Sequence, residues 1–401
     1  MNSNRKLFMC FTIFGVAMIL SSCESEIPKV DSIVQVYESS EPDDTPTDYD
    51  ECIFADLWNP VHFQSVRAPR YLGDETHFGY IAMHHVVYMN DYLYSRAPFT
   101  QRELYAAVWI VEELLAMGYT WADIEIQQFH YRDVGLTASS ASERNRNYSQ
   151  NIILTVPGQS SRTIIVCAHY DSVASVPGAD DNASGTALLL ESAQRMRNIE
   201  HYHTLVYVFF GSHENNMLGA GYFVDALSDV QRDNIVFMFA ADTLLGSFLE
   251  YGTGFHDCEP GNLTDWDNRT IAPGSNSVSR QIDGIANSLF LVYYASGIDS
   301  TRDLARYYSA RANNDIVMFT RPRVIYRGSD QLIFLQEGFT VLTFLGLSIE
   351  RTEAGEYTMP FWGHSRRDNI HMINENNPGM PEEALRVFGI FLEAVLLERY
   401  I

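Results

Sequence analysis

The amino-acid sequence predicts an α/β fold, in which helices pack against a sheet. Three apolar runs rich in β-branched and aromatic residues lead into ionisable residues: TIIVCA into His169, TLVYVFF into Glu214 after a short GSH link, and IVFMFAA into Asp242. Such runs are typical of buried strands that end in loops. Ligands of open α/β sheets bind where loops leave the carboxyl ends of the strands. We therefore expect a functional site at this edge of the sheet.

The elements before the first of these runs support the same fold class. Thr100 and Glu103 fit a capping box, which predicts a helix that runs to about Met117. Strands are expected over residues 124–131 and 151–156, followed by a Pro-Gly turn. A helix and two strands ahead of a buried strand are a typical α/β beginning.

The segment TIIVCAHYDSVASVPGADDNASG is the most informative part of the chain. His169 is expected near the end of its strand, and Asp171 on the same side of the extended chain can fix the imidazole tautomer. Asp181 precedes a predicted helix over residues 183–197. Taken singly, these residues have structural interpretations, because Asp180 or Asp181 can cap the helix and His169 can be a core histidine.

The remaining candidate ligands come from later segments. The sequence FWGHSRRDN near the C-terminus contributes a second histidine. Two carboxylates, Glu214 and Asp242, follow predicted strands. Two imidazoles and three carboxylates suit a pair of zinc ions that share one bridging carboxylate. In two-metal hydrolases such ions lie about 3.5–4 Å apart. The five candidate ligands are His169, Asp181, Glu214, Asp242 and His364.

These motifs resemble those of the M28 family of zinc peptidases. The chain contains HYD at residues 169–171, an unbroken GADDNASG at 178–185, HENNMLGA at 213–220, the strand-end Asp242 and HSRRD at 364–368. Their order matches the family's H-x-D, G-A-D-D-N/D-A-S-G, E-E-x-G-L-x-G-S, Asp and H-T-x-x-D. The resemblance extends from about residue 151 to residue 401. A late GSDQ segment also resembles the family's S-D-H, with Gln331 where histidine is usual.

The resemblance implies a three-layer α/β fold with a mixed, mostly parallel, eight-stranded sheet flanked by helices. It also implies hydrolysis of N-terminal peptide bonds by a zinc-dependent aminopeptidase. His169 and Asp242 would lie on one side of the metal pair, with Asp181 as the bridge. Glu214 and His364 would complete the other metal, and Asp171 would orient His169.

His213 is the important departure, because it stands where the family has the glutamate that takes the proton from water. Three interpretations compete. The imidazole can replace that glutamate as the base. Alternatively, it does not reach the water, and the rate falls by about 10² to 10⁴, as for loss of a general base. In the third interpretation it is an extra metal ligand. The sequence analysis assigns His213 and Asp171 to the catalytic set.

Two other functions remain open. One is a glutaminyl cyclase-like transferase with a single zinc ion, which has a related fold. The other is a catalytically weak or inactive surface binding protein. The chain's 51 acidic and 27 basic residues give a net charge of −24, which disfavours nucleic acid as a partner. Peptide is the expected substrate, and the oligomeric state stays open.

The first 51 residues are expected to lie outside the folded domain. Residues 1–23 combine Arg5 and Lys6, an apolar run and the sequence LSSC, and they resemble a lipoprotein signal peptide that ends in a lipobox. Residues 24–51 are acidic and proline-interrupted, as flexible tethers are. The expectation is a cell-envelope lipoprotein, anchored through Cys23, with a peptidase domain over residues 52–401. Cys52 and Cys258 are candidates for a disulfide.

Overall fold

The computed structural model describes residues 78–137, 145–246, 248–254, 276–294, 318–321, 329–347, 350–351, 357–358 and 363–401. These residues all lie in one compact unit, Glu41–Ile401. The predicted signal peptide, lipobox and tether, and the Cys52 and Cys258 pair, lie outside the described residues. No described helix combines the length and apolarity that a membrane span requires.

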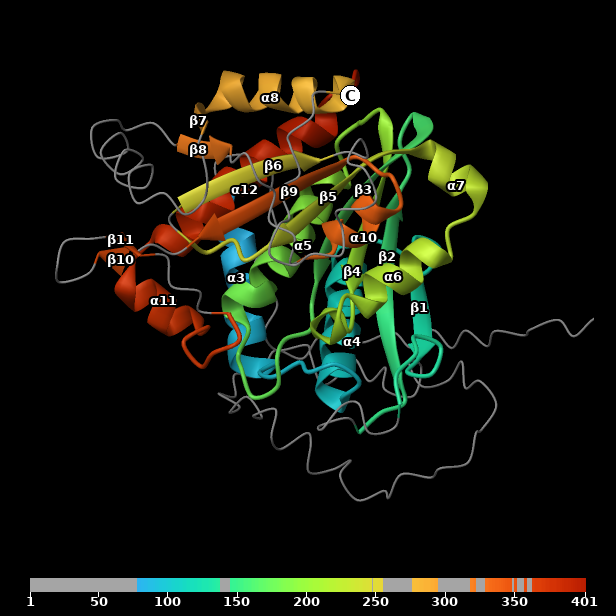
Figure 1. Ribbon diagram of the computed structural model, residues 1–401, viewed down its shortest axis with the longest axis vertical. Helices are drawn as coiled ribbons and strands as arrows, with labels where there is room; N and C mark the ends of the chain where they lie inside the picture. Colours follow the sequence, from blue (N-terminus) through green and yellow to red (C-terminus); the bar gives the residue numbers. More distant parts are fainter. Residues whose placement is uncertain are drawn as a thin grey trace, which may run out of the picture. The chain divides into compact units, whose positions relative to one another are not determined.

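The main sheet has nine strands in the described part of the chain, in the order β1-β2-β4-β3-β5-β9-β6-β8-β7 (Figure 1). Five of its neighbouring pairs are parallel and three are antiparallel, so the sheet is mixed and mostly parallel. Its strands are β1 (Ile124–His130), β2 (Tyr148–Val156), β3 (Ser160–His169), β4 (His203–Phe210), β5 (Ile235–Asp242), β6 (Phe248–Gly254), β7 (Leu291–Tyr294), β8 (Met318–Arg321) and β9 (Val341–Leu347).

The expected count of eight strands differs from these nine. The short strands β7 and β8 pair with each other and extend the β6 side of the sheet. Each has only four residues, which is too short for hydrophobic periodicity to identify from the sequence. A separate two-stranded sheet pairs β10 (Glu350–Arg351) with β11 (Tyr357–Thr358).

The helices and turns follow the α/β order that the sequence predicts. The helices are α3 (Tyr80–Tyr92), α4 (Gln101–Met117), α5 (Ser184–Met196), α6 (Leu218–Asp225), α7 (Asp229–Asn234), α8 (Ser277–Leu289), α10 (Gln331–Gln336), α11 (Ile370–Asn376) and α12 (Met380–Leu397). Two short irregular turns, η2 (Ala179–Ala183) and η3 (His213–Asn215), lie beside the sheet edge that ends β3, β4 and β5.

Helices cover both faces of the sheet, which confirms the three-layer arrangement (Figure 1). On one face, alternate residues of β3, β4 and β5 pack with α6 and α10 in a single apolar cluster. On the other face, α5 contacts β3, β4 and β5, and it also packs against α3, α4 and α12. Since the central strands are covered on both sides, they are apolar almost throughout.

The central parallel strands place the predicted ligands at one edge. In the register of the sheet, His169 at the end of β3 lies opposite Phe210 at the end of β4. Asp242 is the last residue of β5, which pairs with the other side of β3. The strands β3, β4 and β5 are parallel, so the segments that follow them leave the sheet at the same edge and meet there.

The predicted capping box at the start of α4 is half formed, because the Glu103 carboxylate bonds the Phe99 N–H and not the N–H of the N-cap Thr100. The same carboxylate links α4 to this edge of the sheet. Thr100 is the N-cap of α4, and its hydroxyl accepts a hydrogen bond from the Glu103 backbone N–H at 3.3 Å. The Glu103 carboxylate accepts hydrogen bonds from the backbone N–H of Phe99 at 2.7 Å and the Ser149 hydroxyl at 2.7 Å. It also accepts one from the backbone N–H of Ser212 at 2.9 Å. One buried carboxylate therefore holds together α4, β2 and the loop before His213.

Replacing Glu103 with alanine should lower the free energy of unfolding by about 3 kcal/mol, because three buried donors lose their acceptor. Chemical denaturation measures this loss. Glu125→Ala is the control, since Glu125 is an exposed carboxylate on β1. A loss for Glu103→Ala as small as that of the control would contradict the proposed linking role.

Candidate metal centre

All seven candidate residues are described, and they come together at the predicted sheet edge. His169 ends β3, Asp171 follows it, and Asp242 ends β5. Asp181 lies in η2, whereas His213 and Glu214 lie in η3 after β4. His364 precedes α11, far along the chain, and has a left-handed backbone with φ of 59°. Long-range folding therefore assembles one site from five segments.

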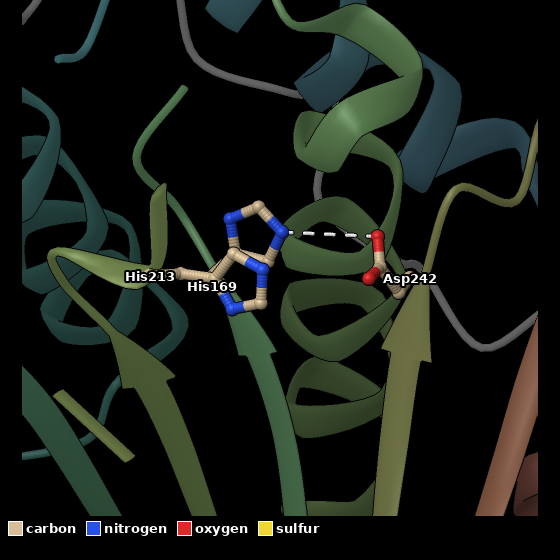
Figure 2. Close-up of side chains that lie close together, drawn as sticks. All are labelled: His169, His213 and Asp242. Atoms are coloured by element: carbon tan, nitrogen blue, oxygen red, sulfur yellow. Dashed lines mark ion pairs between the residues drawn. The ribbon is translucent and has the colours of Figure 1, made fainter. Parts of the chain in front are cut away.

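The first candidate ligand group is His169, His213 and Asp242, whose ligand atoms all lie within 4.8 Å of one another. His169 Nε2 lies 3.7 Å from Asp242 Oδ1 and 3.4 Å from Asp181 Oδ1. Figure 2 shows the His169 and His213 rings stacked, with Asp242 facing the His169 ring. This group is buried against the sheet.

The second candidate ligand group is Asp181, Glu214 and His364. His364 Nε2 lies 3.1 Å from Glu214 Oε2 and 3.4 Å from Asp181 Oδ2. The His364 side chain is 54% exposed, whereas those of Asp181 and Glu214 are below 10%. The site is therefore closed by the sheet on one side and accessible past His364 on the other.

Asp181 connects the two groups. Its Oδ1 faces His169 and its Oδ2 faces His364, each at 3.4 Å. A carboxylate that presents one oxygen to each of two ligand groups has the geometry of a bridging ligand. The interpretation of Asp180 or Asp181 as a helix cap is wrong, because the N-cap of α5 is Ala183 and the side chain that bonds the first turn is Asn182, whose Oδ1 accepts the Gly185 N–H at 2.9 Å.

The polar atoms of the site fit divalent cations. Three buried atoms of the site have no hydrogen-bond partner among the described residues: His169 Nε2, Asp242 Oδ1 and Glu214 Oε1. Buried polar groups without partners are costly, and imidazole nitrogens and carboxylate oxygens are the usual ligands of zinc. Burial and the neighbouring Asp181 raise the pKa of Glu214, although its hydrogen bond with His364 opposes this. A bound cation would relieve that repulsion.

Asp171 supports both sides of the centre. Its carboxylate accepts hydrogen bonds from the backbone N–H groups of His213 and Glu214, each at 3.0 Å. His169 Nδ1 lies 3.5 Å from its Oδ1 and 3.3 Å from its backbone oxygen. Asp171 thus touches His169 as the sequence suggests, but its shortest hydrogen bonds fix the turn that carries the next two candidate residues.

His213 has a partner that the sequence analysis did not single out. Its Nδ1 lies 2.9 Å from Oδ1 of the buried Asp330. Its ring also stacks on that of His169, with centroids 3.7 Å apart and planes 9° apart. Burial and His169 lower the pKa of His213, but Asp330 and Asp242 outweigh them and raise it overall. The GSDQ segment contained the signal, in the aspartate next to Gln331.

Asp368 holds the bridging aspartate in place. Its carboxylate accepts hydrogen bonds from the backbone N–H groups of Asp180 and Asp181. The carboxylate of Asp180 instead accepts the N–H of Leu245 at 2.8 Å, after β5. Burial raises the pKa of Asp368 to about 7. The two neighbouring aspartates therefore differ in role: Asp180 ties the turn to β5, and Asp181 faces the centre.

Part of this chain is similar in sequence to known peptidases. Residues 151–261 match the model of peptidase family M28. Aminopeptidase YwaD of Bacillus subtilis (strain 168) is 30% identical over 144 residues, which are 34% of this chain and 30% of that protein. The alignments span about a third to a half of the length of the first curated relatives.

Solved structures share the fold at low sequence identity. A zinc aminopeptidase from Bacillus subtilis superposes with a TM-score of 0.56 and 16% identity, over 80% of this chain and 95% of that one. A glutaminyl cyclase from Bacteroides thetaiotaomicron gives a TM-score of 0.50 and 16% identity, over 83% and 99%. The segment with the family match also carries His169, Asp181, Glu214 and Asp242. The family match thus covers the segment that carries four of the five candidate ligands, and the likeness to the solved structures is one of fold.

Proposed function

We propose that this protein is a zinc-dependent aminopeptidase that hydrolyses N-terminal peptide bonds. The observation that carries the proposal is the Asp181 carboxylate, whose two oxygens face different ligand groups. Such a shared carboxylate suits two metal ions rather than one. The family match and the aminopeptidase relatives favour a peptide substrate.

In this proposal His169 and Asp242 of the first group would hold the buried zinc ion. Glu214 and His364 of the second group would hold the accessible ion, and Asp181 would be the ligand that both share. His213, the third member of the first group, is kept as the base. When bound, zinc supplies Lewis acidity, which polarises a carbonyl group and lowers the pKa of water. Asp171 holds two parts of the site in place: its backbone oxygen contacts the His169 ring, and its carboxylate bonds the turn that carries Glu214. A peptide reaches the centre past the exposed side of His364.

We assign His213 the role of proton acceptor. Neutral His213 that donates its Nδ1–H to Asp330 has an unprotonated Nε2, which is the tautomer that a base requires, and bound cations would counter the rise in its pKa. The alternative is that His213 is a further metal ligand, since its ligand atom lies within 4.8 Å of those of His169 and Asp242. The zinc content of the His213→Ala variant separates the two roles.

The location of the protein is a proposal from the sequence alone. Residues 1–23 carry the lipoprotein leader, Cys23 is the lipidated residue, and residues 24–51 form the tether to the domain over residues 52–401. The catalytic domain would then act on peptides in the cell envelope, with membrane contact through the lipid on Cys23.

Turnover of amino-acid p-nitroanilides by protein lacking residues 1–23 tests the activity. We expect zinc-loaded protein to release p-nitroaniline, a chelator to abolish the release, and added zinc to restore it. Glu214→Gln should lose most of the activity, whereas Glu375→Gln, an exposed carboxylate of α11, should retain it. N-acetylated substrates should be resistant, because they lack the free amine. Equal cleavage of acetylated and free substrates would contradict an aminopeptidase.

Replacing His213 with alanine should lower kcat by about 10² to 10⁴, as for loss of a general base. Bound zinc, measured by mass spectrometry, should stay at the wild-type level. Asp330→Asn should give a smaller fall in kcat. The control is His371→Ala, because His371 pairs with Asp91 at 2.8 Å in an exposed position. Unchanged kcat in His213→Ala would exclude the base, and loss of zinc would identify a ligand.

A glutaminyl cyclase-like transferase is the second candidate. The observation that favours it is the second group, since Asp181, Glu214 and His364 alone provide three ligands for a single zinc ion. Peptides with N-terminal glutamine distinguish the two functions. Formation of pyroglutamate without release of amino acids would support the cyclase. Zinc binding with neither reaction would instead indicate a binding protein.

A further inference from the structure

Arg96 is a fully buried arginine beside the metal centre, in the segment between α3 and α4. Three of its N–H groups donate to backbone carbonyls: Nε to Tyr170 at 2.6 Å, Nη1 to Pro177 at 2.8 Å and Nη2 to Gly178 at 2.8 Å. These carbonyls lie at the two ends of one loop. The planar guanidinium therefore ties the start of that loop to its end.

The loop that Arg96 holds is the one that connects His169 to the turn carrying Asp181. Backbone contacts add to the three side-chain bonds. The Arg96 N–H donates to the Ser172 hydroxyl at 3.0 Å, and the Ser172 N–H donates to the Arg96 carbonyl at 3.2 Å. At Gly178, an added Cβ would lie 2.9 Å from Arg96 Nη2. The loop thus packs directly on the guanidinium.

The positive charge of Arg96 also interacts favourably with the carboxylates around the centre. Burial lowers its pKa to about 10, while Asp368, Asp171, Asp181 and Glu214 act in the opposite direction. The guanidinium therefore remains charged at neutral pH. It is a fixed positive charge next to the carboxylates of the centre, held by backbone oxygens that do not neutralise it.

We infer that Arg96 is a positioning residue that sets the separation of His169 and Asp181, and so preorganises the metal centre for zinc. The inference rests on the zinc site of the proposed function. Arg96 touches no reacting atom in this account. It acts through the loop that joins a ligand of the buried ion to the bridging ligand, as groups that orient metal ligands do.

Arg96→Lys is the main test, because lysine keeps the charge but cannot bond three separate carbonyls in one plane. Zinc affinity is measured on the full chain by competition with a chromophoric chelator, well below the unfolding temperature. We expect a 10- to 100-fold loss, the range typical of residues that orient metal ligands. Arg195→Lys is the matched control, since Arg195 is also buried but pairs with Glu191 within α5.

If Arg96→Lys does not fold, a second variant tests the inference. Ser172→Ala removes one hydrogen bond to the Arg96 backbone and leaves the guanidinium in place. We expect it to weaken zinc binding by several-fold, with little effect on the unfolding temperature of the metal-free protein. Affinities within twofold of wild type in every folded variant would overturn the inference.

These readouts separate this inference from the proposed function. Zinc binding without peptidase turnover in the wild type would contradict the proposed function, while the Arg96 comparison would remain decisive. Normal turnover and normal zinc affinity in Arg96→Lys would contradict the inference alone. A wild-type protein that binds no zinc would contradict both.

Discussion

Repulsion among buried carboxylates at one edge of the sheet is the constraint on which the site depends. Asp171, Asp181, Glu214 and Asp242 are gathered there with side chains that are almost entirely withdrawn from water. Like charges in such a place repel one another and oppose folding. The structure offsets this cost with backbone N–H donors, with the buried charge of Arg96, and in our account with two cations.

The strands of the sheet position one side of the centre, and the loops position the other. Parallel strands β3 and β5 deliver His169 and Asp242 as their last residues, so rigid elements fix the buried side of the centre. Loop residues supply the accessible side, where His364 is half exposed. A rigid inner half and an open outer half suit an enzyme that holds its cofactor firmly while admitting substrate.

Much of this arrangement could be predicted from the sequence, because it depends on local patterns. The runs before His169 and Asp242 are continuous apolar segments, and the box at Thr100 and Glu103 has a fixed spacing. Partners that meet only in the folded chain were missed. Asp330 lies 117 residues from His213, and Arg96 lies 74 residues from Tyr170. Neither spacing has a sequence signature.

The central claim is that Asp181 bridges two zinc ions, and anomalous diffraction at the zinc edge from crystals of the zinc-loaded protein tests it most directly. Our account predicts two anomalous peaks about 3.5–4 Å apart, one near each Asp181 oxygen. The inner peak should contact His169 and Asp242, and the outer peak Glu214 and His364. A single peak among Asp181, Glu214 and His364, or peaks that leave Asp181 unbound, would contradict the account.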